Sequence, residues 1–186
     1  MSRKDDILDS AETLARSHGF DGFSYADIER EVGIRKASIH HHFASKQALA
    51  LALVERYREN FAITLAEIAT PDASAGDRLK AFLDVYKVAL SGGATVCLCV
   101  SLSASRQSLN DDVVDAVNHF HADVLAWLEE TFAHGRSDGS INGVASPAAE
   151  ASATLALVEG AQLMAHAARD PSTFEVAVAG LRARAP

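Results

Sequence analysis

The sequence predicts an all-helical fold, and three of its features support this prediction. Alanine and leucine, which favour helices, dominate the composition. Apolar residues recur at steps of three and four along most of the 186-residue chain, and no segment alternates between apolar and polar residues as a half-buried strand would. With only 4 prolines and 6% aromatic residues, the chain lacks the turn-rich, aromatic-rich composition of an all-β protein. We therefore expect an all-α protein of about nine helices.

The first expected helices lie before Pro71 and are marked by local start and stop signals. Ser2 with Asp5 three residues later resembles a capping box, and Gly19 ends that helix. Gly33 ends the second helix, and Pro71 closes the segment. The expected ranges are Ser2–His18, Ser24–Val32, Lys36–His42 and Ser45–Ala69.

The rest of the chain is also predicted to be helical and is more apolar. A glycine pair at 92–93 interrupts the pattern, and a glycine- and serine-containing linker is expected from Gly135 to Gly143. Ser146 followed by Pro147 opens another long helix. The expected segments are Arg78–Leu90, the dense apolar run Thr95–Leu102, Asn110–His134, Ser146–Arg169 and a last helix that begins at Pro171.

Charge is distributed unevenly along the chain. The formal net charge of −8 at pH 7 by itself counts against a nucleic-acid partner. The segment from Arg35 to Lys46, however, contains basic residues and consecutive histidines but no carboxylate. It therefore predicts a local basic surface on an acidic protein, with a solvated helix face as the alternative interpretation.

The third expected helix has the geometry of a recognition helix in a helix-turn-helix. Two short helices separated by a glycine turn follow a longer one, which is the outline of that motif. At 100° per residue, Ile39 and Phe43 both face inward, so the polar residues between them face outward. The expected DNA contacts come from that outward face and from its flanks. They are Ser24, Arg35, Lys36, Ala37, Ser38, His40, His41, His42 and Lys46.

These residues closely resemble the DNA-binding domain of TetR-family transcriptional regulators. The resemblance rests on spaced matches at residues 24–28, 32–34, 36–43 and 45–46 and covers residues 3 to about 60. Typical members have glycine where Ala37 stands and tyrosine at His40. The resemblance implies a homodimer that reads a palindromic double-stranded DNA operator through residues 1–60. It also implies that residues 61–186 bind a small-molecule effector and dimerise, most simply as a repressor released by its ligand.

The ligand pocket is expected among large apolar residues of the second domain, which would suit a hydrophobic effector. The candidate lining residues are Phe61, Phe82, Tyr86, Cys97, Leu102, Phe120, Trp127 and Met164. The candidate polar anchors are Tyr86, Gln107, His119 and Gln162. The long helices Asn110–His134 and Ser146–Arg169 are the expected dimer elements, because the second is rich in alanine and permits close helix approach.

The sequence also offers alternatives to this function. Cys97 and Cys99 could sense oxidants or electrophiles, but they lie in an apolar run with no basic residue nearby in the sequence. Successive histidines on a helix point 100° apart and do not converge on a metal. Asp115, His119 and Asp123 share one helix face and could hold a metal weakly, but a polar stripe at the surface or at an interface, with pairs within the helix, explains them better.

No nucleophile elbow, P-loop or dinucleotide motif is present, so we expect no cofactor and no enzyme. An enzyme that uses His119 and a helical adaptor without DNA remain alternatives. No apolar stretch approaches the ~20 residues that cross a bilayer, so we expect a cytoplasmic protein without a membrane partner.

Overall fold

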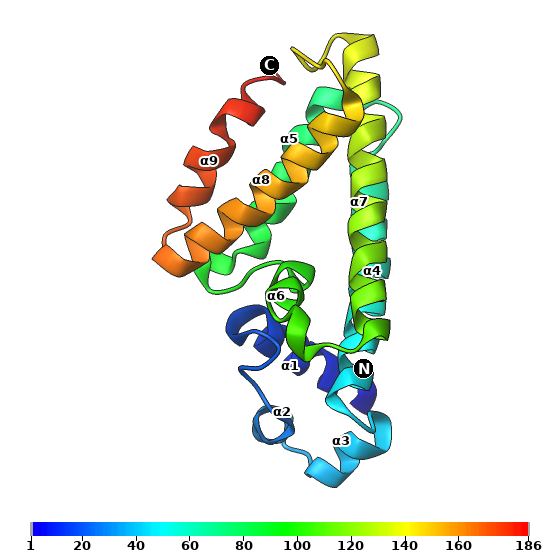
Figure 1. Ribbon diagram of the computed structural model, residues 1–186, viewed down its shortest axis with the longest axis vertical. Coiled ribbons are helices and arrows are strands. Elements are labelled where there is room, and N and C mark those ends of the chain that lie inside the picture. Colours follow the sequence, from blue (N-terminus) through cyan, green and yellow to red (C-terminus); the bar gives the residue numbers. More distant parts are fainter. Residues whose placement is uncertain (1, 186) are drawn as a thin grey trace. The chain divides into compact units, whose positions relative to one another are not determined.

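The computed structural model describes residues 2–185 and is helical throughout that range (Figure 1). It contains nine α-helices and two short 3₁₀ helices within those residues, which confirms the predicted all-α class. The α-helices are α1 (Arg3–His18), α2 (Tyr25–Val32), α3 (Lys36–His42), α4 (Lys46–Ile68), α5 (Ala75–Ala89), α6 (Leu98–Ala104), α7 (Asp111–Asp138), α8 (Pro147–Ala168) and α9 (Ser172–Arg182). The 3₁₀ helices are η1 (Ser91–Gly93) and η2 (Arg106–Ser108).

The helices form two units, each with its own core. The first unit contains the residues up to Glu59 together with Leu98–Phe120. The second contains Asn60–Cys97 together with the residues from His121 onward. The chain thus leaves the first unit within α4, returns to it at α6, and leaves it again within α7.

Most helix ends lie where the local capping signals predict them. The hydroxyl of Ser2 accepts from the Asp5 N–H at 3.3 Å, and the Asp5 carboxylate accepts from the Ser2 N–H at 2.8 Å. Gly33, at φ 70°, adopts the left-handed conformation that ends α2. Ser146 caps α8 ahead of Pro147, as predicted.

Several boundaries differ from the prediction. Helix α6 spans Leu98–Ala104 rather than Thr95–Leu102. Helix α5 begins at Ala75 rather than Arg78, because the hydroxyl of Ser74 accepts from the Asp77 N–H at 3.1 Å and caps the helix there. Helix α7 continues to Asp138 through part of the expected linker. Gly135 is needed inside it, since a Cβ at that position would lie only 2.5 Å from the side chain of Ile141.

In the first unit, α1, α2, α3 and α6 pack around a shared apolar core. Ile7, Ala11, Ile28 and Ile39 are completely buried there. Helix α6 lies against α1, as Figure 1 shows, and the Ser101 hydroxyl donates to the carbonyl of Ala15 at 2.6 Å.

An ion-pair cluster also joins α1 to α4 within the first unit. The guanidinium of Arg56 reaches Asp9 at 2.7 Å and Glu12 at 2.9 Å. Since each carboxylate accepts a charge-assisted hydrogen bond, the cluster fixes how the beginning of α4 lies against α1.

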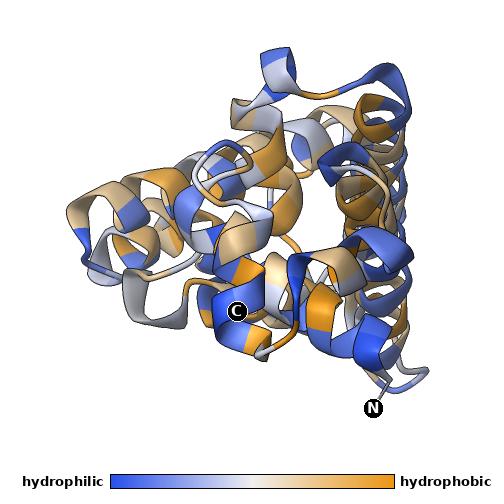
Figure 2. Cartoon of the chain, turned by 90° about the horizontal axis from the view of Figure 1, so that it is seen from below, coloured by the Kyte–Doolittle hydropathy of each residue, from blue (hydrophilic) through white to orange (hydrophobic). Residues whose placement is uncertain are grey.

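In the second unit, α8 packs along α9, and α5 contacts both (Figure 1). The helices of both units carry hydrophobic and hydrophilic residues on different sides, as Figure 2 shows. Phe82, Leu83, Phe132, Val158 and Phe174 are completely buried, so the apolar sides face the core of the second unit.

No single helix in residues 2–185 is both long and apolar enough to span a bilayer. The segments Ala75–Gly93 and Leu98–Ala104 meet that test of length and composition only when they are taken together as a bent pair.

Candidate nucleic-acid interface

Helix α3 presents a polar outer surface above a fixed apolar inner side. Ile39 is completely buried and Phe43 is 5% exposed, which confirms the inward face predicted from their spacing. Lys36, Ala37 and the three histidines of α3 are exposed, Ser38 is half-buried, and the helix contains no carboxylate. A side chain at this surface therefore meets no fixed negative charge from its own helix, as a phosphate-lined groove requires.

Tyr25 of α2 holds the end of α3 in place. Its buried hydroxyl donates to the carbonyl of Phe43 at 3.0 Å, and burial raises the pKa of Tyr25 to about 12. The ring of His40 packs edge-on against the ring of Tyr25, with 4.8 Å between centroids. His40 thus has a packing contact that stiffens the outer surface of α3, which the sequence did not reveal.

Ser24 caps the N-terminus of α2 and is hydrogen-bonded there. Its hydroxyl and its N–H both donate to the carboxylate of Asp27, each at 2.8 Å. These bonds, the hydroxyl first, lower the pKa of Asp27 to about 2. Since the Ser24 donors are occupied, its predicted contact with DNA would require Asp27 to give up a hydrogen bond.

Lys46 has a structural role that the sequence did not predict. Its ammonium donates to the carbonyls of Phe20 and Phe23 and lies over both rings, 4.5 Å and 4.2 Å from their centroids. Burial lowers its pKa. Because an ammonium has three N–H donors, one donor remains for a phosphate after the two carbonyls are bound.

A shallow hollow of about 300 Å³ lies beside this ammonium. It is lined by Phe23, Ser24, Tyr25, Lys36, His40 and Lys46. Two of these six residues are lysines, and Lys36 begins α3. The hollow therefore brings together predicted contact residues from α2, α3 and α4 at one anion-compatible point.

Lys4, which was not among the predicted contacts, lies beside the C-terminal end of α3. Its ammonium lies 5.9 Å from the ring centroid of Phe43, at the end of α3. A cation in the first turn of a helix is disfavoured by the helix dipole, so the pair Arg3–Lys4 at the start of α1 was a usable signal. Arg35, at the N-cap of α3, is exposed.

The segment from α6 to the start of α7 is hydrogen-bonded to the helix-turn-helix within the first unit. The Ser108 hydroxyl donates to Asp21 at 2.8 Å. Gln47 donates to the carbonyl of Ser108 at 2.7 Å and accepts from the Asn110 N–H at 3.2 Å. With the bond between Ser101 and Ala15, these contacts make residues 98–110 an added layer of the first unit.

The ligand candidates divide between the two units. Phe61, Phe82, Tyr86 and Trp127 form a connected aromatic cluster in the second unit. Phe61 contacts Tyr86 at 6.0 Å between centroids, Tyr86 contacts Phe82 at 4.9 Å, and Phe82 stacks on Trp127 at 5.6 Å. Cys97 also lies in the second unit, whereas Leu102 and Phe120 belong to the core of the first.

Two of the predicted ligand contacts have other roles. Met164 is 62% exposed on the outer side of α8, so it does not line the buried core of the second unit, and its contact with a ligand stays a prediction. Gln162 is completely buried, but its side chain donates to the carbonyl of Tyr86 at 2.7 Å and accepts from the Cys97 N–H at 2.9 Å. Its polar groups therefore link three segments of the second unit. Gln107 and His119 are exposed.

The two cysteines are free thiols with almost no exposure, 1% at Cys97 and 0% at Cys99. No basic residue lies near the cysteines in the sequence, but the fold brings His121 of α7 within electrostatic range of Cys97. Nε2 of His121 pairs with Glu159 at 3.1 Å, and this hydrogen bond, together with the charge of Glu159 and that of Cys97, raises the His121 pKa against the opposing effect of burial. Within residues 2–185, no three His, Cys, Asp or Glu side chains are grouped so that they could hold a metal ion.

Comparison with known families matches both halves of the chain. Residues 7–53 match the family described as "Bacterial regulatory proteins, tetR family". Residues 75–181 match the "Tetracyclin repressor-like, C-terminal domain".

Individual proteins are similar over almost the whole chain. NemR of Escherichia coli (strain K12), an HTH-type transcriptional repressor, is 26% identical over 96% of this chain and 92% of its own length. Its reduced form has a crystal structure with a TM-score of 0.83, which covers 100% of this chain and 98% of that chain at 27% identity. A TetR-family transcriptional regulator from Agrobacterium tumefaciens has a TM-score of 0.92 and 33% identity, covering 98% of this chain and 96% of that chain.

Proposed function

The chain belongs to the TetR family of bacterial regulatory proteins, and from that premise we propose that it is a ligand-released repressor that binds a palindromic operator as a homodimer. Members of this family are DNA-binding regulators rather than enzymes, and they act as dimers. NemR, and IcaR of Staphylococcus aureus, which is 46% identical over 46 residues covering 25% of this chain, are both named as repressors. A regulator of this kind works in the cytoplasm, where its operator is.

The carboxylate-free outer surface of α3 is the observation that carries the DNA-binding proposal. In the major groove, Ala37 would let the backbone approach, while His41 and Ser38 could donate to base edges. Arg35, Lys36, Lys46 and Lys4 surround that surface and would bind phosphates, which position the protein without reading sequence.

The outer face of α8 supports a specific dimer interface. Leu157, Leu163 and Met164 are exposed large apolar residues along it. Gly160 lies between them at helical spacing, and a Cβ added there would have no heavy atom within 4 Å. A glycine inside a helix costs about 1 kcal/mol relative to alanine, so open space alone gives no reason for it.

Close approach of a second copy of α8 would explain that glycine. It would cover the leucines and Met164 and use the missing side chain of Gly160 for contact between helices. The predicted alanines support the same division of faces, since Ala151, Ala161 and Ala165 are buried in the chain's own core. Ala153 and Ala156 stay exposed on the outer face.

Ligand release would act through α4 and through residues 98–110. An effector within the aromatic cluster of Phe61, Phe82, Tyr86 and Trp127 would move Gln162 or Cys97, because Gln162 binds both Tyr86 and Cys97. Leu98 follows directly and begins the layer that is hydrogen-bonded to the helix-turn-helix. The operator-bound state would then lose its fit to two major grooves, whose centres lie about 34–36 Å apart.

The test is selection of the full-length protein against a random duplex pool at physiological salt, followed by a salt titration on the selected site. We expect a two-fold palindrome and a steep fall in affinity with salt, because phosphate contacts release counterions. His41→Ala should change the selected sequence more than the affinity, whereas Lys36→Gln should weaken all sequences alike. A folded dimer that enriches no duplex would contradict the proposal.

A further inference from the structure

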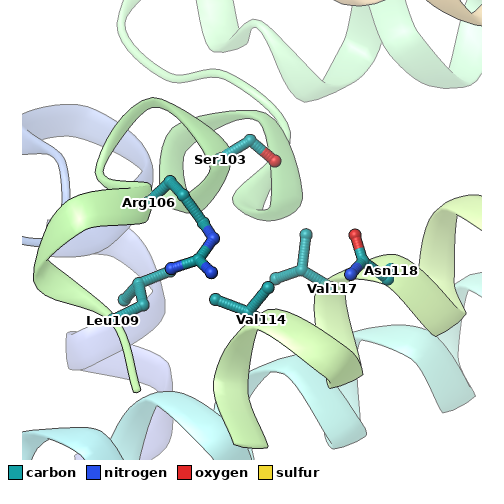
Figure 3. A pocket seen from close by; sticks show the side chains of 6 residues that line it. All are labelled: Ser103, Arg106, Leu109, Val114, Val117 and Asn118. Atoms are coloured by element: carbon teal, nitrogen blue, oxygen red, sulfur yellow. The ribbon is translucent and has the colours of Figure 1, made fainter. Parts of the chain in front are cut away.

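A groove of about 240 Å³ in the first unit lies outside both the DNA-binding surface and the aromatic cluster. It is formed where α6 and η2 face the first turns of α7 (Figure 3). Its lining residues are Ser103, Arg106, Leu109, Val114, Val117 and Asn118. Its volume is below the roughly 300–1,000 Å³ of pockets that hold drug-sized ligands, so it suits a small molecule.

Arg106 gives the groove its charge. Figure 3 shows the side chain extending over the groove between Leu109 and Val114, with its guanidinium toward α7. Among the residues that the structure describes, this guanidinium has no hydrogen-bond or ion-pair partner, although the nearby first turns of α7 carry Asp111, Asp112 and Asp115. A guanidinium without a protein partner is free to bind a carboxylate through two parallel hydrogen bonds.

The rest of the groove sets the shape of the ligand. Leu109 and Val117 are 8% and 5% exposed and, with Val114, form an apolar wall next to the guanidinium. Ser103 and Asn118 lie toward the other end, as Figure 3 shows. A ligand that fills the groove therefore needs one anionic end and an apolar body.

We propose that this groove binds a small amphipathic monocarboxylate, held by Arg106 at its charged end and by Leu109, Val114 and Val117 along its apolar chain. The three aspartates in the first turns of α7 disfavour a dianion such as phosphate more strongly than a monoanion. Inorganic phosphate would also leave the apolar wall uncovered. The site belongs to the layer that carries Ser101 and Ser108, which are hydrogen-bonded to the helix-turn-helix.

The test uses hexanoate as the probe and measures binding without DNA, so that its outcome is independent of the proposed operator function. Isothermal titration of the full-length protein with sodium hexanoate should give saturable binding with a Kd of about 0.1–10 mM. Hexan-1-ol and sodium phosphate should bind at least about tenfold more weakly, since each lacks one half of the recognition.

Two variants locate the binding. Arg106→Gln should weaken hexanoate binding at least about tenfold, whereas Arg136→Gln, at an exposed arginine in the last turn of α7, should leave binding unchanged. Ser103→Trp fills the groove from an exposed position and should also abolish binding. Hexanoate that binds Arg106→Gln and Ser103→Trp as tightly as the unmodified protein would overturn the proposal. So would the absence of saturation below about 50 mM.

Discussion

Helices α3 and α8 both have a buried apolar inner face, but the outer face of α3 is polar whereas that of α8 is apolar. In α3, Ile39 is completely buried, and the outer face is polar, histidine-rich and free of carboxylates. In α8, Val158 is completely buried, and the outer face carries exposed leucines, Met164 and an unfilled glycine. Burial of the inner face makes each helix part of its unit, so only the outer face can indicate a partner. A polar, basic face fits a phosphate-lined groove, whereas an apolar face that includes an unfilled glycine fits a second copy of the same helix.

The largest expected effect comes from placing charge on the outer face of α8. The double variant Leu157→Glu/Met164→Glu should convert the dimer to a monomer, because two buried like charges would face their own copies. Loss of the second half-site should lower operator affinity by about 100-fold or more. Sedimentation equilibrium and operator titration measure the two effects.

The control for that variant is Val88→Glu, which charges an equally apolar position on α5 that is 77% exposed. It should leave the dimer and the operator affinity unchanged. If the double variant remains a dimer, the outer face of α8 is not the dimer interface, and its apolar character does not indicate a second copy of the helix.

The next largest effect is expected at Lys46, beside the DNA-binding surface of α3. Lys46→Ala removes two hydrogen bonds to the backbone carbonyls of Phe20 and Phe23 and two contacts with their rings, so the free energy of unfolding of the first unit should fall by about 1–3 kcal/mol. Loss of a phosphate contact should also flatten the salt dependence of operator binding by about one unit.

Urea unfolding and salt titration separate the two roles of Lys46. Lys80→Ala, which removes a lysine paired with Asp77 in the second unit, is the matched control and should change neither quantity. A stability loss with an unchanged salt slope would leave Lys46 a purely structural residue and would contradict its contact with phosphate.

Substitution of Gly160 should have a smaller effect, which is stabilising in the monomeric double variant and destabilising for the dimer of the otherwise unmodified protein. In the monomeric Leu157→Glu/Met164→Glu background, Gly160→Ala should raise the free energy of unfolding by about 1 kcal/mol, because the added Cβ meets only open space. In the otherwise unmodified protein, the same change should weaken dimerisation. Thermal unfolding and sedimentation at several concentrations measure both, and equal stabilisation of the two backgrounds would show that no helix approaches Gly160.

The smallest effect concerns the inner side of α8, where Glu159 pairs with His121 of α7. The carboxylate of Glu159 accepts from the His121 ring and raises the pKa of His121 above the unfolded value of about 6.5, so folding favours the protonated ring. The stabilisation is complete below that unfolded pKa and is lost as pH rises through the higher folded pKa.

We therefore expect His121→Asn to destabilise the protein more at pH 5.5 than at pH 8.5, as measured by urea unfolding at each pH. Glu159→Gln should reduce the pH dependence in the same way, because it removes the main cause of the raised pKa. If the loss of unfolding free energy in these variants is the same at both pH values, the pair of His121 and Glu159 is not its cause.

Much of the fold could be predicted because helix boundaries depend on neighbours in the chain. Ser2 and Asp5, Gly33, and Ser146 with Pro147 act over at most four residues, and each lies at a helix end as expected. The missed cap at Ser74 has the same local signature, with Asp77 three residues later, so α5 could also have been placed correctly. The inward face of α3 followed from spacing alone for the same reason.

Local sequence patterns were therefore enough to predict the helical class, most helix ends, and the polar face of α3 with its resemblance to TetR-family DNA-binding domains. The tertiary contacts determine which hydrogen-bond donors of these residues are already occupied within the protein and which surfaces stay exposed to a partner. Lys46 binds carbonyls 23 and 26 residues away, Ser101 binds Ala15, and Gln162 joins Tyr86 to Cys97. Met164 lies outside, and Arg106 faces a groove. Helical periodicity repeats within a few residues and reveals which side of a helix is apolar, but the partner of each polar group depends on contacts between distant segments, which no local pattern encodes.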